Sequence, residues 1–131
     1  MIEPSSFEAE VLELHAFFER WYSGVAALTE FSRMDVLADS FVLIGPDGRS
    51  STVEQVREFV EAAYGRRPTG FEIRNVAVRP HTPVGTYEEW QTVGNATTGR
   101  ISTAVMMLDP DTPNGLRWVH LHETWLPEVR P

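Results

Sequence analysis

Apolar residues recur at helical spacing in the first half of the chain and predict three helices. The first is indicated by one stripe of apolar positions at steps of three and four: Phe7, Val11, Leu14, Phe18, Trp21, Tyr22 and Val25. Ser5 and Glu8 have capping-box spacing at its start. A shorter helical pattern follows at Leu28, Phe31, Met34 and Leu37. The third helix is predicted over Val53–Tyr64, where Ser51 and Glu54 repeat the capping-box spacing.

In the second half the spacing of apolar residues changes to two, the period of a β-strand. Before that change, Phe41–Ile44 is a short β-prone run, and Pro46-Asp47-Gly48 predicts a turn within a small hairpin. Four longer strands are predicted: Phe71–Arg79, Val84–Val93, Arg100–Leu108 and Leu116–Leu126. Short segments rich in turn formers separate them, as in a meander of antiparallel hairpins. Helices followed by strands predict an α+β fold, with the helices on one face of an antiparallel sheet.

The last predicted strand, Leu116–Leu126, carries the most distinctive pattern in the chain. Because side chains alternate along a strand, one face carries Trp118, His120, His122 and Thr124, and the other carries Arg117, Val119, Leu121, Glu123 and Trp125. Both faces hold large apolar groups, which predicts a covered strand in the middle of the sheet. Buried imidazoles need polar partners, so the histidine face is predicted to line a water-containing cavity. The other face is predicted to be buried against a second copy in a homodimer.

The composition excludes several kinds of chemistry. The chain of 131 residues has a net charge of −8, which disfavours nucleic acid and anionic membranes as partners. It has no cysteine and no lysine, so thiolate, disulfide and Schiff-base chemistry are excluded. Acid–base groups must then be carboxylates, tyrosines or the histidines, which are His15, His81, His120 and His122. No apolar run has the roughly 18 residues of a membrane span, and the acidic N-terminus lacks signal-peptide features, so a cytoplasmic location is expected.

Three stretches resemble the nuclear-transport-factor-two-like superfamily, which includes the SnoaL-like proteins and has a cystatin-like α+β cone. They are Leu37–Gly48, the helix Val53–Tyr64 and the closing WVHLHETW, and the resemblance covers nearly the whole chain. It implies a single SnoaL-like domain over residues 1–131, in which three helices pack on a curved antiparallel sheet and leave an inner pocket. The implied element order is α-α-β-α-β-β-β-β. This fold hosts many activities, so function is argued from the site.

Steroid isomerases are the best-known enzymes of this superfamily, and the resemblance places their two functional positions in this chain. Their base, an aspartate, directly precedes the proline of the first stretch, where this chain has Gly45 before Pro46. Their oxyanion-binding tyrosine corresponds to Trp21, with Tyr22 one residue further along. A step of one residue turns a helical side chain by about 100 degrees, so Tyr22 is not a direct substitute. Steroid-isomerase chemistry is therefore not predicted.

The candidate catalytic residues are His120 and Glu89. Glu89 is predicted to lie on the inner face of a neighbouring hairpin, where it would orient His120 as an acid or base. Ligand contacts are predicted for five residues expected to line the pocket: Trp21, Tyr64, Tyr87, Trp118 and His122. A metal site would have only two strand histidines as ligands, with Glu89 as the best candidate for a third. No bound metal is therefore predicted, and no cofactor is expected. His15 adjoins the apolar stripe and is interpreted as an interfacial or exposed histidine without chemistry.

Two functions follow from these observations. The first is a small-molecule-binding protein with an aromatic-lined pocket for an apolar or aromatic ligand, which histidine–carboxylate acid–base chemistry could extend to a lyase, isomerase or cyclase. The alternative is a non-catalytic dimerisation or association module with a vestigial cavity. A wet cavity with converging polar groups favours the first function, whereas a cavity filled by Trp21 and Trp118 favours the second. The sequence names neither the ligand nor the reaction, and it leaves open whether the chain is an enzyme.

Overall fold

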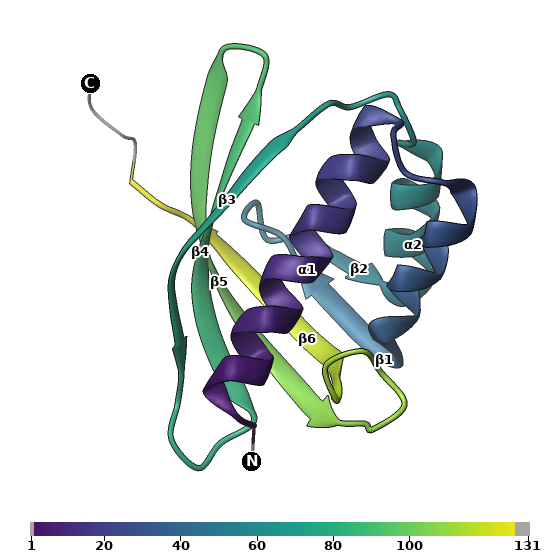
Figure 1. Cartoon of the computed structure of the whole chain (residues 1–131). Coiled ribbons are helices and arrows are strands. Elements are labelled where there is room, and N and C mark those ends of the chain that lie inside the picture. The colour runs from purple at the N-terminus through teal and green to yellow at the C-terminus, as the bar shows by residue number, and fades with distance from the viewer. Residues whose placement is uncertain (1, 128–131) are drawn as a thin grey trace.

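Helices and strands follow one another in the predicted order in the computed structural model, which describes residues 2–127 (Figure 1). The elements are helix α1 (Pro4–Ser23), the 3₁₀ helix η1 (Leu28–Val36), strands β1 (Leu37–Ile44) and β2 (Ser50–Thr52), helix α2 (Val53–Ala62), and strands β3 (Gly70–Val78), β4 (Val84–Val93), β5 (Ala96–Leu108) and β6 (Leu116–Trp125). The short strand β2 completes the small hairpin predicted after β1. The second predicted helix is present as a 3₁₀ helix.

The six strands form one mixed sheet in the order β2-β1-β6-β5-β4-β3. Every neighbouring pair is antiparallel except β1 and β6, which run parallel. The predicted antiparallel arrangement therefore holds for the hairpins but not for this pair. Most of the chain lies between β1 and β6, so no hairpin turn dictates their relative direction.

The sheet curves around α1, which lies across its concave face, while η1 and α2 lie together at one side (Figure 1). The apolar stripe of α1 is buried in the core, where Phe7, Val11 and Leu14 are at most 4% exposed. Gly85 of β4 lies directly against Phe7, because a Cβ atom built at Gly85 would be 2.3 Å from the Phe7 ring. The missing side chain lets α1 approach the sheet closely. The observed fold is therefore the predicted α+β cone.

Both α-helices begin near the predicted capping boxes but not at them. α1 begins at Pro4, whose fixed φ suits the first helical turn, and the N-cap residue Glu3 makes no capping bond through its side chain. α2 is capped by Thr52: its hydroxyl accepts from the Gln55 amide, and the Gln55 side chain accepts from the Thr52 amide. The capping predictions at Ser5 and Ser51 are therefore wrong, because proline and threonine define these helix starts.

A β-bulge at Val119 determines which face of the sheet the side chains in the second half of β6 lie on. Adjacent residues of β5 lie opposite Trp118 and His120, so Val119 is an extra residue on β6. The alternation of side chains therefore slips by one position at the bulge. Trp118 before the bulge and Leu121 after it both point to the concave face, where they line the same cavity.

Candidate ligand-binding site

A cavity of about 230 Å³ lies between α1, α2 and the concave face of the sheet. Most of its wall is apolar, and the apolar residues that line it include Leu14, Phe18, Met34, Phe41, Phe71 and Trp118. One region of the wall is polar and contains His15, Tyr87, Glu89, Gln91, Arg100 and Glu123. Phe59 and Arg67, which are both exposed, lie at the rim. A mostly apolar cavity with a few clustered polar groups is typical of small-molecule sites.

A hydrogen-bonded pair formed by His15 of α1 and Glu89 of β4 lies at the centre of the polar region. Both residues are 4% exposed. The Nδ1–H of His15 donates to the carbonyl oxygen of Val11 at 2.7 Å, since a carbonyl can only accept, and Nε2 lies 2.7 Å from Oε1 of Glu89. Gln91, two residues along β4, donates to Oε2 of Glu89. Each member of the pair is therefore held in place by a partner from its own element.

Burial and charge act on this pair in opposite directions. Burial alone would lower the pKa of His15, but the Glu89 carboxylate outweighs it, so the pKa of His15 is raised overall. Burial would raise the pKa of Glu89, but the His15 charge and the hydrogen bonds from His15 and Gln91 lower it overall. The two shifts favour an imidazolium–carboxylate ion pair between His15 and Glu89, in which each buried charge compensates the other.

A second carboxylate in the cavity, Glu123 of β6, lies close to the same arginine as Glu89. The Nη1 of Arg100 donates to Oε1 of Glu123 at 3.0 Å, and the Nε of Arg100 lies 4.0 Å from Oε2 of Glu89. Burial and repulsion from Glu89 raise the pKa of Glu123 to about 7, although Arg100 opposes the shift. Glu123 therefore gains or loses a proton near neutral pH.

Three buried polar atoms in or beside the polar region have no hydrogen-bond partner among the described residues. They are the hydroxyl oxygens of Tyr87 and Ser102 and the Nε of Arg100. Tyr87 and Ser102 lie opposite each other on β4 and β5. Because buried polar groups are normally paired, unpaired groups beside a cavity mark a place where water or a ligand can supply the partner.

The structure brings three of the seven predicted site residues into the cavity wall: Tyr87, Glu89 and Trp118. Trp21 and Tyr64 do not line the cavity, so their predicted ligand contacts are not supported. They pack against each other with ring centroids 4.5 Å apart. Their polar atoms donate to backbone carbonyls at 2.7 Å from Trp21 and 2.6 Å from Tyr64. These two aromatic residues join α1 to the segments around α2 and form part of the core.

The predicted orientation of His120 and His122 is wrong. The bulge at Val119 places both on the outer face, and Leu121 and Glu123 take the expected places in the cavity wall. The two imidazole centroids are 6.5 Å apart, so the histidines do share a face, as the alternation predicted. The face itself could not be derived from a regular period of two, because the bulge interrupts that period.

His15 is the cavity histidine that the sequence interpretation missed, because it was assigned no chemistry. A signal was available: His15 follows Val11 by four positions and precedes Phe18 by three, so it lies within the apolar stripe of α1. A titratable residue inside such a stripe must find a polar partner in the core. That partner is Glu89, which the sequence analysis assigned to His120.

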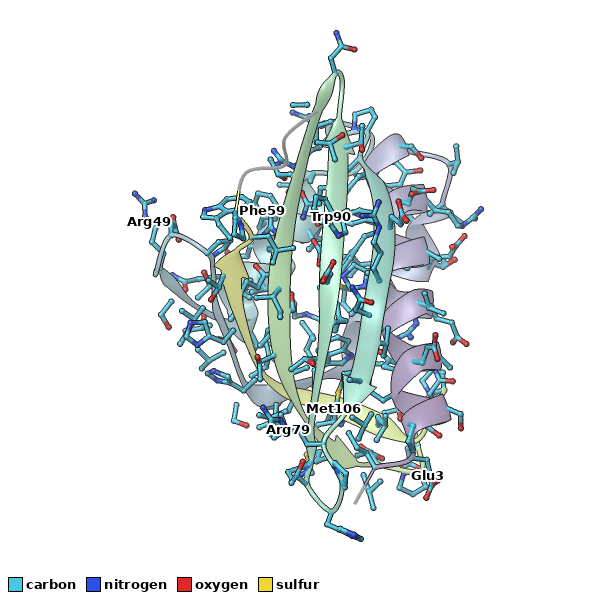
Figure 2. All side chains as sticks on the ribbon, turned by 90° about the vertical axis from the view of Figure 1, so that its left-hand side faces the viewer. Glu3, Arg49, Phe59, Arg79, Trp90 and Met106 are labelled. Carbon is cyan, nitrogen blue, oxygen red and sulfur yellow. The ribbon has the colours of Figure 1, made fainter. Side chains whose placement is uncertain are left out.

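The outer face of the sheet differs from the predicted dimer surface. Leu121 lines the cavity, and Trp125 lies on the concave side, where its ring centroid is 4.8 Å from the guanidinium carbon of Arg100. The outer face presents Ile101 and Met107 of β5, which are 41% and 48% exposed. Figure 2 looks onto this face, on which Trp90 lies and which none of the described helices covers.

A third buried carboxylate, Glu10 of α1, lies outside the cavity. Its side chain is fully buried and accepts three hydrogen bonds, from Arg33 at 2.8 Å, Asn114 at 3.1 Å and Trp118 at 2.8 Å. These donors come from η1, from the loop before β6 and from β6 itself. Glu10 therefore fastens α1 to three distant segments and has a structural role.

The polar region offers few ligands for a metal or cofactor. Both ring nitrogens of His15 are already bonded, which leaves no free lone pair at neutral pH. Among residues 2–127, no three or more histidine, cysteine, aspartate or glutamate side chains are grouped so that they could hold a metal ion.

Within residues 2–127, no helix is both long and apolar enough to cross a membrane.

Solved structures similar to this chain define its fold class. An NTF-2-like protein of unknown function from Pseudomonas aeruginosa matches with a TM-score of 0.83 and 23% identity, over 93% of this chain and 99% of that one. An NTF2-like protein of unknown function in nutrient uptake from Rhodospirillum rubrum matches with a TM-score of 0.65 and 14% identity, over 96% and 100%. The CaMKII hub of S. rosetta matches with a TM-score of 0.62 and 16% identity, over 90% and 95%. The chain therefore has the NTF-2-like fold. No family model and no curated protein matches its sequence.

Proposed function

We propose that this chain is a small-molecule-binding protein whose ligand occupies the cavity between α1 and the sheet. The observation that carries the proposal is the buried His15–Glu89 ion pair, which faces a mostly apolar space of about 230 Å³. If the space served packing alone, apolar side chains at these positions would serve equally well, since burying charges is costly. The unpaired Tyr87 hydroxyl supports the same proposal, because a ligand can supply its partner.

The cavity volume limits the size of the ligand. Pockets for drug-sized molecules measure roughly 300–1,000 Å³, and this cavity is smaller. Aromatic side chains such as Phe18, Phe71 and Trp118 form much of the wall, which favours a flat apolar body. The ligand proposed is therefore a molecule of one or two rings with a polar group that reaches the His15–Glu89 region.

Glu123 is the cavity residue best suited to exchange a proton with the ligand. An acid or base is most effective when its pKa lies near the working pH, and burial raises the pKa of Glu123 to about 7. Glu89 is a weaker base, because its ion pair with His15 lowers its pKa. For a catalytic activity we propose proton transfer through Glu123, with Arg100 holding its carboxyl group. Glu123 in the cavity wall, and not His120 on the outer face, is therefore the proposed acid–base residue.

The binding proposal is tested by filling the cavity. The neutral two-ring compound 2-naphthamide is expected to bind one site per chain in calorimetry and in saturation-transfer NMR. Leu43→Trp places an indole inside the cavity and should abolish this binding, because Leu43 lines it. Val42→Trp is the matched control, since the adjacent residue faces the opposite side of β1 and pairs with His120. The proposal would be contradicted if neither 2-naphthamide nor its acid, 2-naphthoate, showed saturable binding. Equal loss of binding in the two variants would also contradict it.

We also propose self-association as a homodimer through the outer face of the sheet. The supporting observation is the exposure of Ile101 and Met107 on a face that no described helix covers (Figure 2). A solved structure with the same fold is named as a hub and another as a kinase association domain, which agrees with an associating role. A second copy of the same chain is the occupant proposed here, as a two-fold pair of sheet faces.

Sedimentation velocity at micromolar concentration tests the association. The unmodified chain is expected to sediment as a dimer, and Ile101→Glu should convert it to a monomer, because a dimer would bury the new carboxylate without a partner. Leu12→Glu is the control, since Leu12 of α1 is similarly exposed at 46% but lies on a helix away from the outer face. A monomer at all concentrations, or dissociation by both variants alike, would exclude this interface.

A further inference from the structure

We infer that the ligand of the cavity is an anion: a small flat molecule with one carboxylate group, which Arg67 attracts at the rim and Arg100 faces inside. This inference rests on the proposed binding function and specifies its ligand class. Two observations support it: the net charge of the residues that line the cavity, and the hydrogen bonds and ion pairs that the two arginine side chains make or lack.

The charged residues that line the cavity carry a net positive charge, although the whole chain has a net charge of −8. The positive residues are His15, Arg67 and Arg100, and the negative residues are Glu89 and Glu123. The Nδ1–H of His15 donates to Val11 and its Nε2 lies 2.7 Å from Oε1 of Glu89, so a proton lies between these two side chains and together they add no net charge. The sum is one positive charge, and protonation of Glu123 increases it to two. A concave, partly apolar site of one sign concentrates ligands of the other sign.

Both carboxylates of the cavity already have partners, so neither is free to neutralise Arg67. Glu89 is paired with His15 at 2.7 Å, and Glu123 accepts from Arg100 at 3.0 Å. The Arg67 side chain makes no ion pair or hydrogen bond with any residue between 2 and 127, although its backbone amide donates to Tyr22. Arg67 is thus a cation at the rim whose partner is not supplied by the described chain.

Arg100 brings a second donor to the interior. Its Nη1 is bonded to Glu123, but its Nε is buried without a hydrogen-bond partner among residues 2–127 and lies 4.0 Å from Glu89. The Trp125 ring packs over its guanidinium carbon at 4.8 Å, which helps to fix the group in place. A guanidinium with an unused N–H suits a carboxylate, because a hydrogen bond between two charged groups is stronger than one between neutral groups.

The apolar wall determines the rest of the ligand. Phe18 and Phe71 face the cavity with their rings, and Phe59, which is 56% exposed, adds a third ring at the rim. A flat aromatic body therefore fits between the rings while its carboxylate remains near the arginines. An aliphatic dianion or a sugar phosphate would leave this wall poorly covered. The chemical class is a monocarboxylic acid on one or two aromatic rings.

The experiment compares 2-naphthoate with 2-naphthamide, which have the same ring system and differ in charge. Calorimetry at low salt and pH 6.5 is expected to give at least about tenfold tighter binding of the acid, since the carboxylate and the two arginines attract each other at close range. Arg67→Gln should weaken binding of the acid by about three- to tenfold and leave the affinity for the amide within about twofold. Added salt should weaken binding of the acid and not of the amide.

Arg66→Gln is the matched control for Arg67. It removes the same charge from an adjacent exposed residue that does not line the cavity, so it should leave both affinities within about twofold. An amide that binds as tightly as the acid would overturn the inference while leaving cavity binding intact. Equal losses in the Arg66 and Arg67 variants would also overturn it, because net charge alone would then explain the preference. If neither compound binds, the proposed function itself fails.

Discussion

Glu10 and Glu89 are both buried carboxylates, and each lies where α1 meets the sheet, but their surroundings differ in one respect. Glu10 accepts hydrogen bonds from three side chains and faces no cavity. Glu89 is bonded to His15 and Gln91 and faces a cavity that also contains the unpaired Tyr87 hydroxyl. Burial of a carboxylate is therefore not enough to identify a functional site.

The difference lies in the capacity of each cluster to change its partners. Every donor around Glu10 belongs to a packed segment, so loss of the carboxylate would leave buried donors without an acceptor. The cluster around Glu89 contains a histidine, which can be neutral or charged, and it faces a space open to water or ligand. Substitution of glutamate by glutamine at both positions measures this difference directly.

The largest effect is expected for Glu10→Gln. The amide introduces N–H donors among the donors of Arg33, Asn114 and Trp118 and removes the counter-charge of Arg33, so the free energy of unfolding should fall by about 3–5 kcal/mol. Urea denaturation measures the change. Glu8→Ala, at an exposed position of the same helix, should remain within about 0.5 kcal/mol of the unmodified chain. A loss below 1 kcal/mol for Glu10→Gln would contradict the structural role.

A second effect, in the pH dependence of stability, is expected from Glu123. Its pKa is raised in the folded protein from 4.5 to about 7, so the folded state retains a proton that the unfolded state releases. The free energy of unfolding should therefore fall as the pH rises from about 4.5 to about 7 and stay lower above this window. Glu123→Gln should remove on the order of 3 kcal/mol of this fall.

Denaturation curves of both proteins at several pH values between 4.5 and 8 test this prediction. The facing groups His15, Glu89 and Arg100 remain in the variant, so the contribution of His15 is retained. Because the pKa of His15 is raised, its contribution is present below pH 6.5 and is lost as the pH rises through its folded pKa. Identical pH profiles for the two proteins would show that Glu123 titrates at its ordinary value.

A smaller loss of stability is expected for Glu89→Gln. A glutamine at this position can donate to Nε2 of a neutral His15, whose Nδ1–H still donates to Val11, so every group keeps a partner. The loss should be about 1 kcal/mol, and burial should then keep the pKa of His15 below its ordinary range. Urea denaturation and NMR titration of the His15 ring measure both quantities. A loss as large as that of Glu10→Gln would remove the distinction between the two clusters.

The smallest effect is expected for His120→Ala on the outer face. It should change the free energy of unfolding by no more than about 0.5 kcal/mol and leave 2-naphthoate binding unchanged. Leu121→Ala, one residue further along β6, is the comparison variant, because Leu121 lines the cavity and its truncation should alter binding. Calorimetry on the two variants decides the point. Loss of binding in His120→Ala alone would restore the orientation first predicted from the sequence.

The fold was predictable from the sequence because its determinants are local and periodic. The apolar stripe of α1 and the alternation in β4 and β5 require no knowledge of the neighbouring elements. The shared facing of Tyr87 and Glu89 followed from the same alternation. Trp118 was predicted to face inward together with His120 and His122, and only Trp118, which precedes the bulge, does so. The parallel pairing of β1 with β6 could not be derived in this way, because it depends on how the sheet is assembled from distant segments.

The candidate site was predictable only in part, for two physical reasons. The bulge at Val119 is a single extra residue, and nothing in the local composition distinguishes it from a regular strand position. The pairing of His15 with Glu89 joins residues 74 positions apart, and sequence spacing gives no information on such a contact. The assignment of Glu89 to His120 failed for both reasons together.

The bulge at Val119 also has a consequence for how this protein could evolve. The last strand presents Leu121 and Glu123 to the cavity, and it presents His120 and His122 to the outer face. A mutation that converts the bulge into a regular strand position would turn the two histidines inward without replacing any of these four residues. Descendants of one gene could thus exchange a carboxylate-bearing pocket for a histidine-bearing one in a single step. New chemistry on this scaffold is therefore accessible through strand register as well as through substitution.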